Sequence, residues 1–217
     1  SISFLLIPFI IKLYSPDTWY ANTGILKAVM GAIDSCIIQL YFASEGIPLV
    51  NGLKSLLEPS IRREDNDNDI KYYGSGGSVA FSLEECLNDV KKTNDKKLDG
   101  FKMRCGLKPF KEDIGRVNGV ADFINNSKSN KKISLMIDFI QGTLKPKLRV
   151  NELLNYIKEI DIKNIYWIEE PLNPDDVSLY EELARSEFNN VKFCLGESFT
   201  CLNEYYAFKN IINFFQL

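Results

Sequence analysis

Residues 165–172 read IYWIEEPL, a run of aromatic and β-branched residues that ends in two adjacent glutamates and a proline. Such a run is typical of a buried β-strand. Burying an unpaired carboxylate costs so much free energy that the group usually takes up a proton instead. We therefore expect partners for Glu169 and Glu170 close to the end of this strand.

The stretch around residue 168 belongs to a pattern that repeats from about residue 70 onward. Apolar, strand-like segments alternate with segments of helical periodicity. The expected strands are 70–77, 100–106, 133–139, 165–171, 191–198 and 211–217, and the expected helices are 82–92, 112–126, 149–160, 175–186 and 201–210. Near-continuously apolar strands that alternate with helices are typical of parallel β/α units. We therefore predict an α/β fold, preceded by a helix over 24–43.

Charged residues close the middle strands of this pattern. Lys102 and Arg104 lie two residues apart in one strand, so their side chains share a face. Asp138, Glu169 and Glu197 close the next three strands, each about one strand-loop-helix unit after the last. The carboxyl ends of parallel strands lie at one edge of the sheet, where β/α folds bind their ligands. Three carboxylates are therefore expected to converge.

A divalent cation would relieve the repulsion among these three carboxylates. All-oxygen ligation suits a hard ion, with Mg²⁺ as the first choice and Mn²⁺ as the second. The alternative is that each acid caps the following helix or pairs with a neighbouring base. Because the acids follow three successive strands beside a Lys/Arg strand, the pattern favours the metal site.

Composition excludes several classes of protein. The 217 residues include no histidine, which excludes a Ser-His-Asp triad or a histidine-ligated metal within this chain. The net charge of −3 provides no basic field, so nucleic acid is not expected as a partner. The chain has five cysteines and no CxxC pair, which indicates reduced thiols and a cytoplasmic location.

The first residues, SISFLLIPFIIKLY (1–14), are apolar but interrupted by Pro8. This stretch is too short to span a bilayer and lacks the basic start and small-residue cleavage site of a signal peptide. We expect either a packed helix or a sequence that starts inside a domain, and no membrane partner.

The sequence resembles the enolase superfamily, specifically its mandelate racemase/muconate lactonizing branch. The resemblance is carried by GFKMRCG (100–106), LMIDFIQG (135–142), YWIEEPL (166–172) and CLGES (194–198), in that order. It implies that residues 1–69 are the helical C-terminal part of an α+β capping domain. It also implies that residues 70–217 form an incomplete (β/α)₈-type barrel of about six parallel strands, where the closed barrel has eight.

The resemblance also implies roles for the charged residues. The implied Mg²⁺ ligands are Asp138, Glu169 and Glu197. Lys102 would hold the substrate carboxylate. Arg104 stands where the family often has a second lysine as general base, but a guanidinium is a poor base at neutral pH, so Arg104 would orient or neutralise substrate. Lys102 and Arg104 are therefore the candidate catalytic and substrate-binding residues.

The family's shared step removes the proton α to a carboxylate, so we expect a Mg²⁺-dependent enzyme with a small-molecule carboxylate substrate. The first expectation is a dehydratase that acts on an acid sugar. The complete protein is expected to be a homo-oligomer. A racemase, epimerase or cycloisomerase of the same branch, or a non-catalytic barrel fragment, remains the alternative. The residues matching the family's last two strands and usual histidine base are absent, and Ile140 replaces a usually polar residue. The chain by itself is therefore expected to be inactive.

Overall fold

The computed structural model describes residues 24–56, 70–127, 132–140, 149–188 and 190–216. The chain divides into two units, one of residues 1–70 with 200–202 and one of residues 71–199 with 203–217. The opening stretch 1–14 lies outside the described residues. No helix in the described ranges combines the length and apolar character needed to cross a membrane.

Within its described residues 24–56, the first unit contains two helices, α2 (Gly24–Ser44) and α3 (Leu49–Leu56). The sequence predicted α2 but not α3. Gly52 of α3 lies against the ring of Phe42, where an added Cβ would come within 2.3 Å of a ring carbon. Only a glycine permits this approach. The assignment of residues 1–69 to a capping domain stays a prediction.

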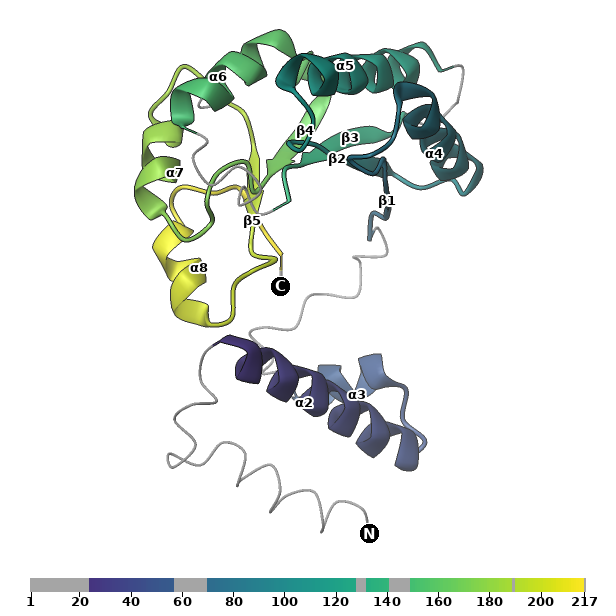
Figure 1. The fold of residues 1–217 in the computed structure, drawn as a ribbon. Coiled ribbons are helices and arrows are strands. Elements are labelled where there is room, and N and C mark those ends of the chain that lie inside the picture. Colours follow the sequence, from purple (N-terminus) through teal and green to yellow (C-terminus); the bar gives the residue numbers. More distant parts are fainter. Residues whose placement is uncertain (1–23, 57–69, 128–131, 141–148, 189, 217) are drawn as a thin grey trace. The chain divides into compact units, whose positions relative to one another are not determined.

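The second unit is a six-stranded sheet in the order β1-β2-β3-β4-β5-β6, with every neighbouring pair parallel. The strands are β1 (Tyr73–Gly76), β2 (Gly100–Arg104), β3 (Ser134–Asp138), β4 (Ile165–Glu169), β5 (Phe193–Leu195) and β6 (Phe214–Phe215). The helices are α4 (Leu83–Asp95), α5 (Phe110–Asn126), α6 (Val150–Glu159), α7 (Val177–Ala184) and α8 (Leu202–Phe208), with a short 3₁₀ turn, η2 (Ile162–Asn164). Figure 1 shows the helices on the outer side of the strands. The predicted partial barrel of parallel strands is confirmed.

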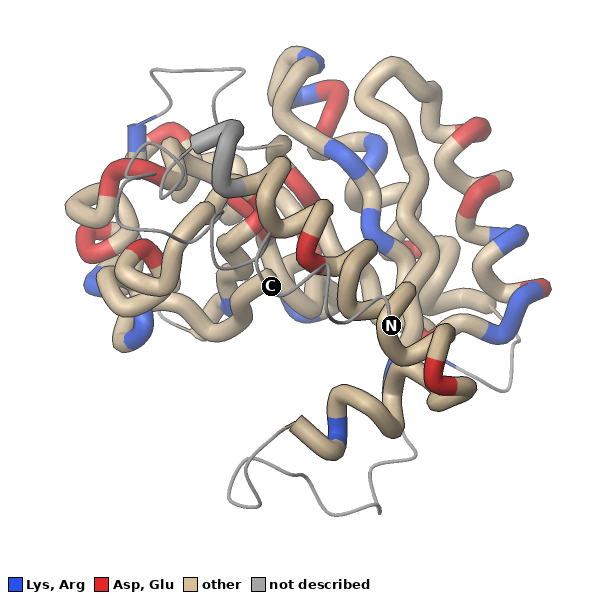
Figure 2. The backbone as a smooth tube through the Cα atoms, turned by 90° about the horizontal axis from the view of Figure 1, so that it is seen from below, with Lys and Arg blue, Asp and Glu red and all other residues tan. Residues whose placement is uncertain are grey.

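Acidic and basic residues are interspersed over this unit (Figure 2). Helix α4 illustrates how local sequence sets an element's start. The Ser82 hydroxyl accepts the Glu85 N–H, and the Glu85 carboxylate accepts the Ser82 N–H, so the two residues form a capping box.

Strand alternation divides the sheet into two faces. Phe101, Met103, Leu135, Ile137 and Ile168 are at most 1% exposed and belong to the apolar core shared with the helices. The residues between them in sequence face the opposite, concave side, because successive side chains in a strand alternate. This side carries Lys102, Met136, Asp138, Trp167, Glu169 and Cys194. Met103, which is fully buried in this core, therefore faces the helices.

The parallel register aligns the strand ends. Arg104 pairs with Asp138, Asp138 pairs with Glu169, and Glu169 pairs with Cys194. The chain then turns sharply, because each of the first five strands is followed within two residues by a residue of positive φ. These residues are Gly77, Gly106, Ile140, Glu170 and Gly196. Three of the five are glycines, which adopt positive φ without steric cost.

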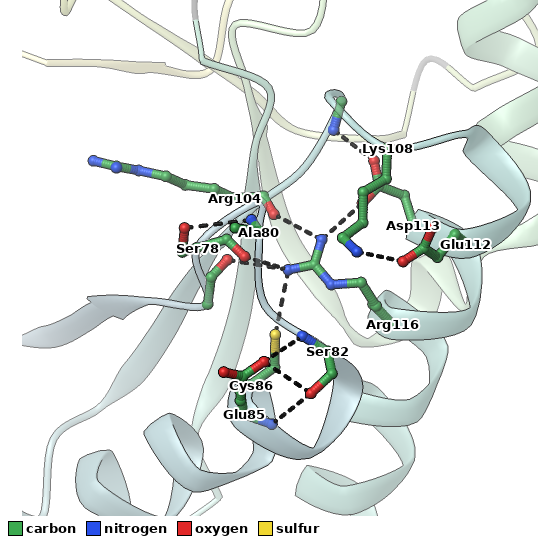
Figure 3. A network of polar contacts seen from close by, with 12 residues as sticks. Ser78, Ala80, Ser82, Glu85, Cys86, Arg104, Lys108, Glu112, Asp113 and Arg116 are labelled. Atoms are coloured by element: carbon green, nitrogen blue, oxygen red, sulfur yellow. Dashed lines mark hydrogen bonds and ion pairs between the residues drawn. The ribbon is translucent and has the colours of Figure 1, made fainter.

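A buried ion pair anchors the loops that follow β1 and β2 (Figure 3). Asp113 and Arg116, both on α5, are almost wholly buried, with 2.8 Å between Asp113 Oδ1 and Arg116 Nη1. The other oxygen of Asp113 accepts the backbone N–H of Gly106 at 2.7 Å. Asp113 therefore joins the start of α5 to the loop after β2.

The guanidinium of Arg116 extends this anchor to a second loop. It donates to the carbonyl oxygens of Gly77 at 3.3 Å, Ser78 at 2.7 Å and Arg104 at 3.5 Å, and it contacts the Cys86 sulfur on α4 at 3.3 Å. Figure 3 shows Arg116 between these groups. The ends of β1 and β2 are thus held together by one side chain.

Candidate metal centre

Three carboxylates meet at the carboxyl end of the sheet. Asp138 closes β3, Glu169 closes β4, and Glu197 follows β5 by two residues. Each offers one oxygen, and these oxygens all lie within 4.8 Å of one another. Asp138 and Glu169 are buried, whereas Glu197 is exposed. The structure therefore brings together the three acids predicted as metal ligands, and their binding of a metal stays a prediction.

Asp138 is oriented by the backbone that follows it. Its Oδ1 accepts the N–H of Ile140 at 2.7 Å, in a turn where Ile140 has a φ of 53°. Positive φ is a strained conformation for a β-branched residue. The turn that holds the Asp138 carboxylate in place therefore contains a residue in a strained backbone conformation.

Glu169 is fully buried and is surrounded by hydrogen-bond donors. The Lys102 ammonium lies 2.7 Å from its Oε1 and 2.8 Å from its Oε2. The Gln216 amide donates to Oε1 at 2.7 Å, and the Trp167 indole N–H donates to Oε2 at 3.4 Å. These donors make it possible to bury Glu169 as a carboxylate.

Lys102 lies between two of the three acids, since its ammonium is also 3.5 Å from Asp138 Oδ2. Burial alone would lower the pKa of Lys102. The hydrogen bond and charge of Glu169, together with the charge of Asp138, outweigh burial and raise this pKa above its usual value. Lys102 is therefore a protonated lysine at neutral pH.

Glu170 is not part of the cluster formed by the three acids, although it is also fully buried. Its Oε1 accepts the Gly196 N–H at 3.4 Å and the Ser198 hydroxyl at 3.5 Å. Its Oε2 has no partner among the described residues. Burial raises the pKa of Glu170 to about 7. The two glutamates of IYWIEEPL are thus buried in different surroundings. Glu169 is surrounded by positive and polar hydrogen-bond donors, whereas Glu170 has few donors and its pKa is raised.

Gln216 was not identified from the sequence. Its Nε2 donates to Glu169, and its Oε1 accepts the backbone N–H of Glu197 at 3.1 Å, so it links two of the three acids. Because a carboxylate and an N–H require opposite ends of the amide, these partners fix its orientation. Gln216 follows β6, the same strand-end position that marked the acids, and that position was the available signal.

Arg104 does not join the cluster. It is exposed, and Figure 3 shows its side chain extending away from Asp113 and Arg116. Across the described part of the chain, no ion pair connects its guanidinium to Asp138, Glu169 or Glu197. Its predicted catalytic or substrate-binding role stays a prediction.

A separate cavity of about 230 Å³ lies at the amino ends of the strands. Its lining includes Tyr73, Tyr166, Trp167 and Phe214, whose rings contact one another with centroids 5.3–5.8 Å apart. None of the three acids lines this cavity. It lies at the end of the sheet opposite to the one where β/α folds place their chemistry.

We expect the Ile140→Asn variant to be more stable than the wild type by about 1 kcal/mol, because asparagine tolerates positive φ and isoleucine does not. Urea unfolding followed by circular dichroism measures the change. Leu107→Asn is the control, since Leu107 is an exposed loop residue without positive φ. Equal effects of the two substitutions would show that Ile140 stores no strain.

The fold and the cluster define a β/α-barrel protein with a carboxylate site at the carboxyl ends of its strands. Residues 85–213 match the family model described as enolase C-terminal domain-like. The chain belongs to this family, within the enolase superfamily and of the mandelate racemase/muconate lactonizing type. The resemblance noted in the sequence is thus confirmed.

Individual relatives agree with this assignment. The chain is 23% identical over 199 residues to L-talarate/galactarate dehydratase of Salmonella typhimurium, covering 89% of this chain and 44% of that protein. A Bradyrhizobium enolase, crystallised with magnesium and mandelic acid, has a TM-score of 0.72 at 17% identity and covers 97% of this chain and 52% of its own. The 3,6-anhydro-D-galactonate cycloisomerase of Zobellia galactanivorans has a TM-score of 0.72 at 18% identity, covering 97% and 53%. The chain spans about half the length of these relatives.

Proposed function

We propose that this chain carries the Mg²⁺ site of an enzyme that removes the proton α to a carboxylate. The observation that carries the proposal is the approach of three carboxylate oxygens to within 4.8 Å of one another from successive strand ends. Asp138, Glu169 and Glu197 would hold the cation. When bound, Mg²⁺ supplies positive charge against the negative charge that develops on a substrate carboxylate as its α-proton leaves.

The donor set fits a hard cation. The three acids offer only oxygen, which Mg²⁺ and Mn²⁺ prefer. Cys194 lies on the same face of the sheet, where burial raises the pKa of its thiol, and its sulfur is not among the ligand atoms that converge with the three acids. The ammonium of Lys102 already occupies a position between Asp138 and Glu169, which supports a place for positive charge there.

The chain's own residues would bind and orient the substrate. Lys102 carries a full positive charge beside the acids and is suited to an anionic substrate group. In this structure Lys102 is protonated, and the guanidinium of Arg104 is a poor base at neutral pH, so neither side chain is suited to accept a carbon-bound proton. The proton acceptor is therefore a different group, and the chain alone is expected to bind the cation without turnover.

The finer proposal is a dehydratase of a sugar acid, supported by the 23% identity to L-talarate/galactarate dehydratase. An isomerase would use the same cation and the same proton removal, and the fold shared with a cycloisomerase supports that alternative. The small-molecule carboxylate substrate is common to both. Assembly into a homo-oligomer and a cytoplasmic location stay predictions.

The metal site is tested by the Glu197→Gln variant, which replaces the carboxylate of the exposed acid among the three proposed ligands by an amide. We expect its affinity for Mn²⁺ or Mg²⁺ to fall by at least about 100-fold, because substitutions even beyond the ligands themselves cost 10–100-fold. Isothermal titration calorimetry measures the affinity. Glu187→Gln is the control, because Glu187 is an exposed acid paired with Lys158 on α6. Equal affinities of the two variants would contradict the proposed site.

A further inference from the structure

The carboxylate of Glu169 has no acceptor position to spare. A carboxylate offers about four such positions, and Lys102 donates to both oxygens, Gln216 to one and Trp167 to the other. Because the side chain is fully buried, water does not provide a further exchange partner at its surface. A cation that binds Glu169 must therefore displace one of these donors.

Lys102 is the donor most readily displaced. The Trp167 ring is packed against Tyr73 and Phe214, with centroids 5.8 Å and 5.3 Å away. The Gln216 amide is held at its other end by the backbone N–H of Glu197. Lys102 instead has a flexible stem with four carbons, and its head is a compact charge.

The positive charge of Lys102 is a second reason why a cation would displace this donor from Glu169. Its ammonium lies 2.7 Å from Glu169 and 3.5 Å from Asp138, between the two carboxylates that a shared cation would have to bridge. Like charges repel strongly at such distances in a poorly solvated site. The Lys102 ammonium and a divalent cation would thus compete for the same position between the two carboxylates.

On the basis of the metal site proposed above, we propose that Lys102 competes with the divalent cation for Glu169, so that cation binding moves the ammonium off this carboxylate. Without the cation, Lys102 neutralises the buried acids and keeps the cluster folded. With the cation, the acids no longer need it, and its charge becomes available to an anionic ligand. Lys102 is therefore a residue whose partner depends on occupancy of the neighbouring site.

The test measures the Mg²⁺ and Mn²⁺ affinity of the full 217-residue chain by calorimetry. The Lys102→Met variant is expected to bind at least about tenfold tighter than the wild type, since hydrogen bonds to charged groups are worth about a factor of ten or more. Arg104→Met is the matched control, because it removes the same charge from the same strand. It is expected to bind within about twofold of the wild type, since an exposed charge is screened by solvent. Equal gains in both variants would overturn the competition.

A second measurement uses the wild type alone, because removing Lys102 leaves buried acids unpaired and can prevent folding. Acetic anhydride labels lysines, and mass spectrometry reads each site with and without saturating Mn²⁺. Labelling of Lys102 is expected to rise several-fold with the cation, while Lys158, on α6, stays constant. An unchanged Lys102 rate at saturation would overturn the competition. Failure of every chain to bind cation would overturn the metal site as well.

Discussion

The Asp113→Ala variant is expected to lose about 3–5 kcal/mol of unfolding free energy, because it leaves the Arg116 guanidinium buried without its counter-charge. The lost carboxylate also accepts the backbone N–H of Gly106, so a second buried donor loses its partner. Urea unfolding followed by far-ultraviolet circular dichroism measures the difference. The variant is expected to unfold at a lower urea concentration than the wild type, with an unchanged dependence of the unfolding free energy on urea concentration.

Glu112→Ala is the matched control for this substitution. Glu112 precedes Asp113 in the first turn of α5 and also forms an ion pair, with Lys108, but at the surface. Surface ion pairs are worth about 0–1 kcal/mol. If the two variants were destabilised equally, the helix start rather than the buried network would be responsible.

The Gly196→Ala variant is expected to be destabilised by about 3 kcal/mol or more, through backbone strain and overpacking together. Gly196 has a φ of 130°, a conformation that side-chain-bearing residues rarely adopt. An added Cβ would lie 2.4 Å from the carbonyl oxygen of Gln216 and 3.0 Å from its nitrogen. Since these are backbone atoms, the segment at the end of β6 would have to move. Thermal and urea unfolding measure the loss.

Gly115→Ala provides a control of opposite sign. Gly115 lies in α5, is exposed, and has no atom within 4 Å of the added Cβ. Alanine in a helix interior is favoured over glycine by about 0.5–1 kcal/mol. A gain at Gly115 with a loss at Gly196 is expected, and a gain at both would contradict the close approach of β6.

Much of the barrel unit was predictable, because its elements are locally consistent. The expected strand 165–171 contains β4, and the expected helix 112–126 contains most of α5. Helix α3 was not predictable from local preference, since its sequence LVNGLKSL includes Asn51 and Gly52, both weak helix formers. Gly52, the buried residue of this helix, lies against the Phe42 ring of α2, a contact between segments that local preference does not reveal.

The candidate site was predictable where strand spacing determines it. Asp138, Glu169 and Glu197 lie together because parallel strands in register end at one edge. The hydrogen-bond donors to Glu169 were harder to predict from the sequence, since only the order of the strands in the sheet brings Gln216 close to Glu169. The positive φ of Ile140 runs against the preference of a β-branched residue, so sequence alone does not reveal it.

The Asp113–Arg116 anchor has a consequence for the evolution of the loops it holds. The hydrogen bonds that it makes at the ends of β1 and β2, among the described residues, all go to main-chain atoms: the carbonyls of Gly77, Ser78 and Arg104 and the N–H of Gly106. Side chains there can therefore be exchanged without touching the anchor, provided the two glycines keep their conformation. Randomised libraries at Ser78 and Arg104 should consequently yield mostly folded chains, so this rim can change in sequence while the fold is kept.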